Sequence, residues 1–343
     1  MKYLGKNNLI TALLGIIFIA GILFAQTVDE LQAELEQLLQ QRKEYSQQMQ
    51  DATDAGDLDA YNAAKEKYDN ISQKIDEVKN KILALGNKEQ KSKKAINDGN
   101  RYLRLGQYSQ ALEEFNQSLT LNPENPKAYV GKGIALKRLR KYEEAETAFN
   151  KAIEIDPASS SAYYNLAKLH SDLDQNDKAL KNFQKVVEYD STNVRAHYQI
   201  GYIHEKNKNY NKAIEAFQTA IRVNPNYFYP YMALGKVYIE IGSNNKAVEN
   251  LEKAVMIKPN YAAAHYYLAS AYNNVGRHQE ALSAANDCLK YNKSFANAYI
   301  EIGKAYENMG DIQKAIENYQ QAGNMDVRWK KWADWKIDQL RNR

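Results

Sequence analysis

Apolar and small residues recur along most of the chain with one fixed spacing. The phrase KAIEAFQTAIRVNPNY at residues 212–227 has close copies before and after it, such as AETAFNKAIEIDPAS from Ala145 and AVENLEKAVMIKPNY from Ala247. The alanines that open these phrases lie 34 residues apart, without an inserted or missing residue: Ala111, Ala145, Ala179, Ala213, Ala247, Ala281 and Ala315. A constant period of this length indicates a tandem structural repeat.

Within each period the apolar positions fall into two groups with helical spacing. When each repeat is numbered from 19 residues before its alanine, positions 4, 7, 8 and 11 form one face of a first helix, and positions 20, 24 and 27 form one face of a second. Position 8 is always glycine or alanine and position 24 is usually aromatic, so the two helices are expected to pack closely. Turn residues at positions 15–17 separate them, and proline at position 32, present in four repeats, is expected to end the second helix.

The repeats are therefore 92–125, 126–159, 160–193, 194–227, 228–261, 262–295 and 296–329. A single helical pair cannot bury its apolar face, whereas stacked pairs share one continuous core. The pattern resembles the tetratricopeptide repeat (TPR), a helix-turn-helix unit of the same length. The resemblance implies an all-α fold, a right-handed α-solenoid, in which the first helices line a concave groove that binds protein or peptide segments.

Residues 28–85 have a different apolar pattern. Their apolar residues step by three and four along two segments, and DATDAGDLD at residues 51–59 supplies the turn between them. This spacing predicts two helices that form an antiparallel hairpin or parts of a coiled coil. The region has 7 basic and 13 acidic residues, for a net charge of −6. Two interpretations stay open: a solvated hairpin that caps the first repeat, or a coiled coil through which the chain forms homo-oligomers. Residues 86–91 are expected to link this region to the repeats.

The N-terminus predicts export. Residues 1–25 contain Lys2 and Lys6 followed by an apolar run from Leu9 to Ala25, as in a secretory signal peptide. The run is slightly shorter than the roughly 20 residues of a membrane-spanning helix, so an uncleaved anchor is the alternative. The chain is then periplasmic or secreted, and it contacts a membrane only if this segment is retained.

Residues 330–343 are expected to form a helix that caps the last repeat. All three tryptophans lie at this end of the chain: Trp329, Trp332 and Trp335. On a helix Trp329 shares a face with Ala333, Ile337 and Leu340, whereas Trp335 lies off that face. The exposed end of a stacked core needs such a cover.

Composition and charge exclude several function classes. The formal net charge is +4, and it is +2 without Lys2 and Lys6, which gives no electrostatic basis for nucleic-acid binding. Cys288 is the only cysteine, so the chain has no intramolecular disulfide. Four of the five histidines fall at packing positions, and no phosphate-binding loop, metal-ligand cluster or nucleophile motif occurs. We expect a protein that is not an enzyme and uses no cofactor or metal.

First-helix positions 2, 5, 9 and 12 are free of packing duties and would line the groove. Position 5 is apolar or tyrosine in every repeat, and lysine recurs at position 9. Tyrosine offers apolar area and a hydroxyl at little entropic cost, and lysine favours an acidic ligand. The candidate ligand-binding residues are Val130, Tyr164, Lys168, Tyr198, Tyr202, Tyr229, Met232, Lys236, Tyr266 and Lys304. The alternative is that position 5 packs against a neighbouring second helix.

Two functions agree with these features. The first is an exported, non-enzymatic scaffold of the cell envelope that binds a peptide or protein segment in its groove. The second is a self-associating structural protein of the envelope, in which the N-terminal hairpin makes the oligomer and the repeats act as a spacer.

Overall fold

The computed structural model describes residues 28–342, and every regular element in that range is a helix. The predicted signal peptide lies outside the described residues. The chain divides into two compact units between Arg140 and Lys141. No helix between residues 28 and 342 is long and apolar enough to cross a membrane.

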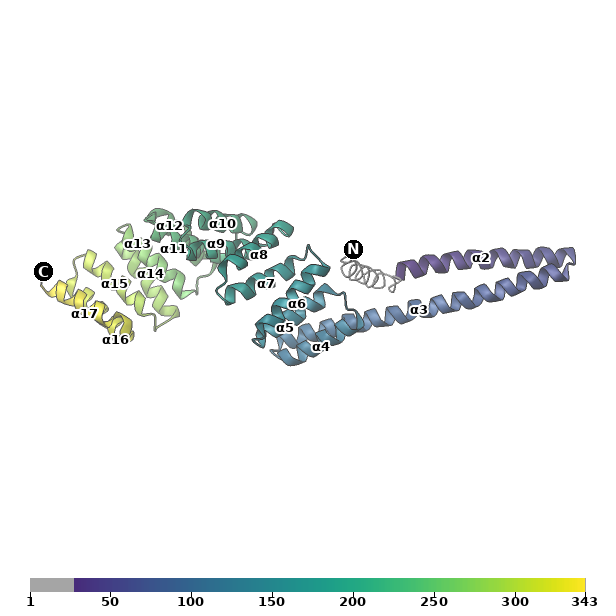
Figure 1. The fold of residues 1–343 in the computed structure, drawn as a ribbon. Coiled ribbons are helices and arrows are strands. Elements are labelled where there is room, and N and C mark those ends of the chain that lie inside the picture. Colours follow the sequence, from purple (N-terminus) through teal and green to yellow (C-terminus); the bar gives the residue numbers. More distant parts are fainter. Residues whose placement is uncertain (1–27, 343) are drawn as a thin grey trace, which may run out of the picture. The chain divides into compact units, whose positions relative to one another are not determined.

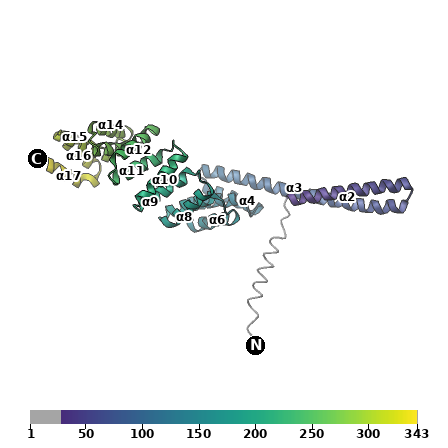
Figure 2. The ribbon, with the colours of Figure 1, turned by 90° about the horizontal axis from the view of Figure 1, so that it is seen from above.

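The first unit contains a long hairpin and the first repeat helices. Its elements are α2 (Val28–Ala55), α3 (Leu58–Arg104), α4 (Tyr108–Leu121) and α5 (Pro126–Arg138). Helices α2 and α3 lie side by side along the length of α2 (Figures 1 and 2). The turn between them is shorter than the predicted 51–59, because α2 continues to Ala55 and α3 begins at Leu58. Asp57 caps α3 by accepting a hydrogen bond from the Ala60 N–H at 2.9 Å.

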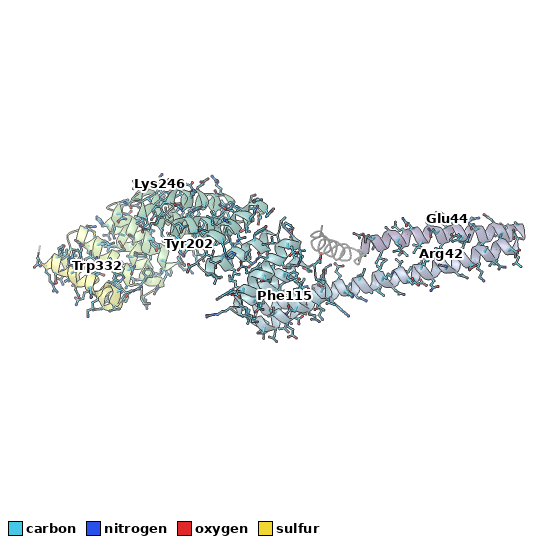
Figure 3. All side chains as sticks on the ribbon, viewed as in Figure 1. Arg42, Glu44, Phe115, Tyr202, Lys246 and Trp332 are labelled. Carbon is cyan, nitrogen blue, oxygen red and sulfur yellow. The ribbon has the colours of Figure 1, made fainter. Side chains whose placement is uncertain are left out.

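Apolar side chains fill a single seam between the two arms of the hairpin. The buried residues are Leu31 and Ala52 on α2, and Ala64, Ile71, Ile75 and Val78 on α3. Arg42, labelled in Figure 3, interrupts this row and is half-buried. Outward positions are mostly Gln, Glu, Asp and Lys, so the seam is occupied by the chain's own two helices.

The predicted linker, residues 86–91, lies inside α3. The helix continues from the hairpin into the first helix of the first repeat, where Ala95 and Gly99 are buried. Apart from Gly86 the segment consists of Asn, Lys, Glu and Gln, without proline, so nothing in it ends a helix. The hairpin and the first repeat are therefore joined by one continuous helix.

The second unit alternates second and first helices of successive repeats, as the period predicts (Figure 1). Its elements are α6 (Tyr142–Ile155), α7 (Ser160–Asp172), α8 (Asn176–Tyr189), α9 (Val194–Lys206), α10 (Tyr210–Val223), α11 (Phe228–Glu240), α12 (Asn244–Ile257), α13 (Ala262–Asn274), α14 (His278–Tyr291), α15 (Ala296–Asn308), α16 (Ile312–Met325) and α17 (Val327–Arg341). The all-α solenoid of helix pairs is confirmed.

Glycine at position 8 lets the two helices of a repeat approach closely. A Cβ on Gly201 would lie 2.6 Å from the Phe217 ring, and a Cβ on Gly303 would lie 2.5 Å from the Tyr319 ring. Both rings are at position 24 and are fully buried, as is Phe115 of the first repeat, labelled in Figure 3. The predicted packing of position 8 against position 24 is confirmed.

Position 15 has a left-handed backbone in all seven repeats. Four repeats place glycine there: Gly106, Gly242, Gly276 and Gly310, with φ between 73° and 84°. The other three place Arg140, Asp174 and Lys208 there, with φ of 61°, 56° and 58°. A side chain with a Cβ is unfavourable in this region, so these three turns contain a strained residue.

A polar residue at position 31, rather than proline at 32, marks the end of the second helices. Helices α8 and α14 end at position 30 although their repeats have no proline at position 32. In six repeats the side chain at position 31 accepts a hydrogen bond from the N–H two residues later, at 3.0–3.2 Å: Asn122, Asp156, Asp190, Asn224, Asn292 and Asp326. Such turns are typical of Asn and Asp. Proline at position 32 is therefore not required for the second helix to end.

Helix α17 covers the last repeat and begins at Val327, earlier than the predicted residue 330. Its face of Ala333, Ile337 and Leu340 is buried, and Trp329 and Trp332 pack against the same cluster. Trp332 is labelled in Figure 3. Trp335 is 54% exposed, in agreement with its place off that face.

Candidate functional site

Four tyrosines, two exposed and two half-buried, lie at the first helices of the fourth and fifth repeats. Tyr198 and Tyr202 lie on α9, four residues apart and therefore on one face, and Tyr229 lies on α11. Tyr227 directly precedes α11. Tyr202, labelled in Figure 3, is 47% exposed, and Tyr229 is 37% exposed. These four residues are called the tyrosine surface below.

Tyr198 connects the tyrosine surface to the core. Its ring centroid lies 5.7 Å from that of Phe217, 5.8 Å from that of Tyr229 and 6.0 Å from that of Tyr227. The Tyr227 and Tyr229 rings are themselves 5.5 Å apart. Burial raises the pKa of Tyr198 well above its ordinary value, so its hydroxyl stays neutral. Because Phe217 is fully buried, these contacts hold the Tyr227 and Tyr229 rings in one arrangement.

The other tyrosines predicted at position 5 are half-buried. Tyr164 on α7 contacts Phe183 edge to face at 5.6 Å between centroids, and Tyr266 on α13 contacts Phe295 at 5.3 Å. Met232 on α11 packs against two clusters of buried residues. Position 5 therefore contributes to packing, as the alternative interpretation proposes, and part of each of these side chains stays accessible.

Two aliphatic residues at position 5 are buried. Val130 on α5, in the first unit, is only 8% exposed, and Ile300 on α15 is only 5% exposed. These two side chains end within the packed layer, whereas Tyr164, Tyr198 and Tyr266 at the same position are half-buried. Val130 thus adds to the packing of its own unit, and the remaining candidate residues lie in the second unit.

Two of the three candidate lysines are paired with carboxylates of the chain itself. Lys236 Nζ lies 2.9 Å from Glu205 Oε1, and Lys304 Nζ lies 2.8 Å from Glu301 Oε1. Glu301 is almost fully buried and also accepts a hydrogen bond from the Asn273 side chain at 2.9 Å. Lys168 is half-buried. The charge that was expected to attract an acidic ligand is therefore largely neutralised.

Lys258 and Tyr227 belong to this region although the groove positions do not include them. The Lys258 ammonium lies 4.9 Å from the Tyr261 ring centroid, 5.5 Å from that of Phe228 and 5.9 Å from that of Tyr229. Contacts of this kind are cation–π interactions. Lys258 occupies position 31, where the other repeats have Asn or Asp, and this departure is the sequence signal that identifies it.

The histidines and the cysteine have packing roles. Between residues 28 and 342 no group of three or more His, Cys, Asp or Glu side chains could hold a metal ion. His197 and His265 donate from Nε2 to the backbone carbonyls of Ser191 and Pro259, at 3.0 and 2.6 Å, and so tie position 4 to the end of the preceding repeat. Cys288 is fully buried, and burial raises the pKa of its thiol to about 12.

Family profiles for the tetratricopeptide repeat match residues 97–160, 148–181, 171–208, 194–227, 235–276 and 296–326. A separate profile, for the N-terminal part of transcription elongation factors, matches residues 22–85 and so concerns the hairpin alone. No curated protein matches the sequence of this chain.

Several solved structures share the fold. The C-terminal part of a TPR repeat-containing protein from Cytophaga hutchinsonii is 19% identical, with a TM-score of 0.56, over 68% of this chain and 95% of that chain. A tetratricopeptide repeat protein from Parabacteroides merdae is 18% identical, with a TM-score of 0.51, over 73% of this chain and 99% of that chain. YrrB, a TPR protein with an unusual peptide-binding site, is 26% identical, with a TM-score of 0.49, over 53% of this chain and 94% of that chain. The family matches and the helix pairs described above agree, and the chain belongs to the tetratricopeptide repeat family.

Proposed function

We propose that this chain binds a segment of another protein on its tyrosine surface. Proteins of this family are typically non-enzymatic interaction scaffolds, and the repeats give this chain the same general role. The observation that carries the finer proposal is the exposure of Tyr202 and Tyr229 on neighbouring first helices, above a half-buried Tyr198 that fixes one of them to the core.

Clustering distinguishes these residues from other exposed tyrosines. Tyr189 and Tyr291, at the ends of α8 and α14, are 43% and 40% exposed. Each contacts one other ring, within its own repeat: Tyr189 stacks on Tyr163 at 5.8 Å between centroids, and Tyr291 lies tilted against His265 at 5.5 Å. A cluster of ordered aromatic side chains gives a ligand more apolar area at a small entropic cost, as in protein-binding hot spots.

The bound segment is expected to carry apolar or aromatic side chains rather than a run of acidic residues. The ion pairs of Lys236 with Glu205 and of Lys304 with Glu301 neutralise two of the three candidate lysines, and the Lys258 ammonium faces the Tyr261, Phe228 and Tyr229 rings. Apolar contact is insensitive to salt, whereas a ligand held by lysines would be released by salt. This proposal replaces the acidic ligand expected from the lysines alone.

The cell envelope, or the outside of the cell, is the proposed location of this scaffold. It rests on the predicted signal peptide at residues 1–25 alone. Self-association through the hairpin has less support, because the apolar seam of α2 and α3 is filled within one chain.

The test is a comparison of partners recovered from an envelope extract. The chain is produced with its own leader, purified through a C-terminal tag, and compared with the double variant Tyr202→Ala and Tyr229→Ala. The matched control is Tyr189→Ala and Tyr291→Ala, which removes the same residue type at similar exposure. All three proteins should unfold at similar urea concentrations, because exposed substitutions change stability little.

We expect a protein that the wild type and the control retain and that the surface variant loses by about tenfold. High salt in the wash should not release it. Equal recovery by all three chains, or loss from the control as well, would contradict the proposal.

A further inference from the structure

The tip of the hairpin has an open apolar hollow. It measures about 390 Å³ and is lined by Ala52, Thr53, Gly56, Asp57, Leu58 and Tyr61. The small residues Ala52 and Gly56 at the end of α2 leave room beside the Tyr61 ring on α3. The residues that line the hollow come from the turn between α2 and α3 and from the helix ends beside it. This turn is the end of the hairpin in Figures 1 and 2.

Leu58 is an unpartnered apolar side chain at this tip. It is the first residue of α3 and is 70% exposed, in contrast to the buried apolar residues of the seam. The helix start is already secured by Asp57, whose carboxylate accepts from the Ala60 N–H. Leu58 lines the hollow together with Tyr61, so the two side chains form one apolar patch at the turn.

The region around the hollow is strongly acidic. Residues 44–64 contain Glu44, Asp51, Asp54, Asp57 and Asp59, and no lysine or arginine. Asp57 and Asp59 lie at the N-terminus of α3, where a helix favours negative charge. Figure 3 labels Glu44 on the hairpin.

Two of these acidic residues stand at the unfavourable end of a helix. Asp51 and Asp54 lie near the C-terminus of α2, whose last turn has no basic residue. A helix C-terminus favours cations and disfavours carboxylates. Their side chains accept hydrogen bonds from Gln47 at 2.7 Å and Gln50 at 2.9 Å, both on the same exposed helix. The helix dipole therefore does not account for this pair of aspartates, and a lysine at either position would suit the dipole better.

We propose that the hairpin tip is a docking site for a basic, amphipathic segment of a partner protein. An apolar side chain of the partner occupies the hollow against Leu58 and Tyr61, and its lysine or arginine residues face Asp51, Asp54 and Asp59. The sign of the charge selects this occupant, because an anionic membrane surface or an acidic segment would be repelled. The site is independent of the tyrosine surface, so the chain has two separate surfaces for partners.

The test uses the full chain and a fluorescein-labelled amphipathic peptide of about 18 residues, built from leucine and lysine at helical spacing. Fluorescence anisotropy measures its affinity for the wild type, for Leu58→Ser, and for the triple variant Asp51→Asn, Asp54→Asn and Asp59→Asn. Asp57 is left unchanged because it caps α3. Matched controls on the same helix are Leu83→Ser, which replaces a leucine that is 64% exposed, and the triple variant Glu66→Gln, Asp69→Asn and Glu77→Gln.

We expect each tip variant to weaken binding by about tenfold and each control variant to change it by less than about twofold. Raising the salt from about 0.05 M to 0.3 M should weaken binding to the wild type and have less effect on the tip triple variant. Circular dichroism should show equal helix content in all variants. Absence of binding, equal losses in tip and control variants, or binding that ignores the tip variants would each overturn the proposal.

Discussion

The seven repeat turns allow the cost of a left-handed residue to be measured within one chain. Lys208 occupies position 15 of the fourth repeat with φ of 58°, and Gly242 occupies the same position of the fifth with φ of 73°. The perturbation is the reciprocal pair Lys208→Gly and Gly242→Ala. Lys208 is exposed, and a Cβ added at Gly242 would have no heavy atom within 4 Å, so packing is preserved in both variants.

The magnitude follows from two opposing costs. A residue with a Cβ is destabilised by about 1–2 kcal/mol in the left-handed region. Glycine loses more backbone freedom on folding, which costs about 0.5–1 kcal/mol. The difference predicts that Lys208→Gly stabilises its repeat by about 0.5–1 kcal/mol and that Gly242→Ala destabilises its repeat by a similar amount. Asp174 is a poorer choice, because its carboxylate pairs with Lys206 at 2.7 Å.

Amide hydrogen exchange on the full chain resolves the effect repeat by repeat, because stacked repeats open locally. Exchange in α9 and α10 should slow by about two- to fivefold in Lys208→Gly, and exchange in α11 and α12 should accelerate by about the same factor in Gly242→Ala. Helices α15 and α16 of the last repeat serve as an internal reference. Faster exchange in Lys208→Gly, or unchanged exchange in Gly242→Ala, would refute the argument from backbone strain.

Three further outcomes are expected. Phe217→Ala empties a fully buried position and should cost about 3–5 kcal/mol in urea unfolding, whereas the exposed Tyr189→Ala should cost less than about 1 kcal/mol; similar costs would contradict the packing of position 24. The Cys288 thiol should not react with Ellman's reagent in the native chain at about pH 8, and should react once urea unfolds it, because it is buried with its pKa raised to about 12. Burial raises the pKa of Tyr272 to about 12 and that of Tyr198 further, from 10.0, and it raises that of Cys288 to about 12 from 9.0, so the folded chain retains protons that the unfolded chain releases. Stability should therefore fall as the pH rises from about 9 toward 12, and a constant urea midpoint between pH 8 and 11 would contradict this.

The repeat architecture was readable from the sequence because its packing rule is local. A glycine or alanine at position 8 must face the bulky residue at position 24 in the same repeat, and the Gly201–Phe217 contact has that geometry. The cap followed from the same helical spacing, with Trp335 correctly placed outside the buried face. Because the pattern occurs in seven repeats, an atypical residue in one repeat does not change the prediction.

The errors arose where apolar periodicity carries no information. Residues 86–91 contain no large apolar side chain, so a solvated stretch of helix has the same sequence signal as a linker. The helix stop at position 31 was readable from its Asn and Asp residues but was assigned to the more familiar proline at position 32. Both features depend on polar residues, whose hydrogen bonds the pattern of apolar positions does not report.

The sequence predicted which repeat positions lie near the candidate site, but not which of their side chains pack in the core, form ion pairs or stay exposed. Position 5 is apolar or aromatic throughout, yet Val130 is buried and Tyr198 joins core and surface. The pairing of Lys236 with Glu205 joins neighbouring first helices, and its formation depends on how those helices approach each other. A sequence gives the residues of such a pair but not the distance between them.

Because α3 is continuous, it fixes both the distance and the rotation of the hairpin tip relative to the first repeat. Residues 58–91 precede the first repeat, and at about 1.5 Å per residue they place the tip about 50 Å from it along the helix axis. Each residue inserted or deleted between 86 and 91 would turn the tip by about 100° about that axis as well as shifting it. A flexible connection would absorb such a change, whereas this helix transmits it in full. An insertion or deletion therefore keeps the direction in which Leu58 points only if its length is close to a whole number of helical turns. The distance from the first repeat to the tip can then change only in such steps.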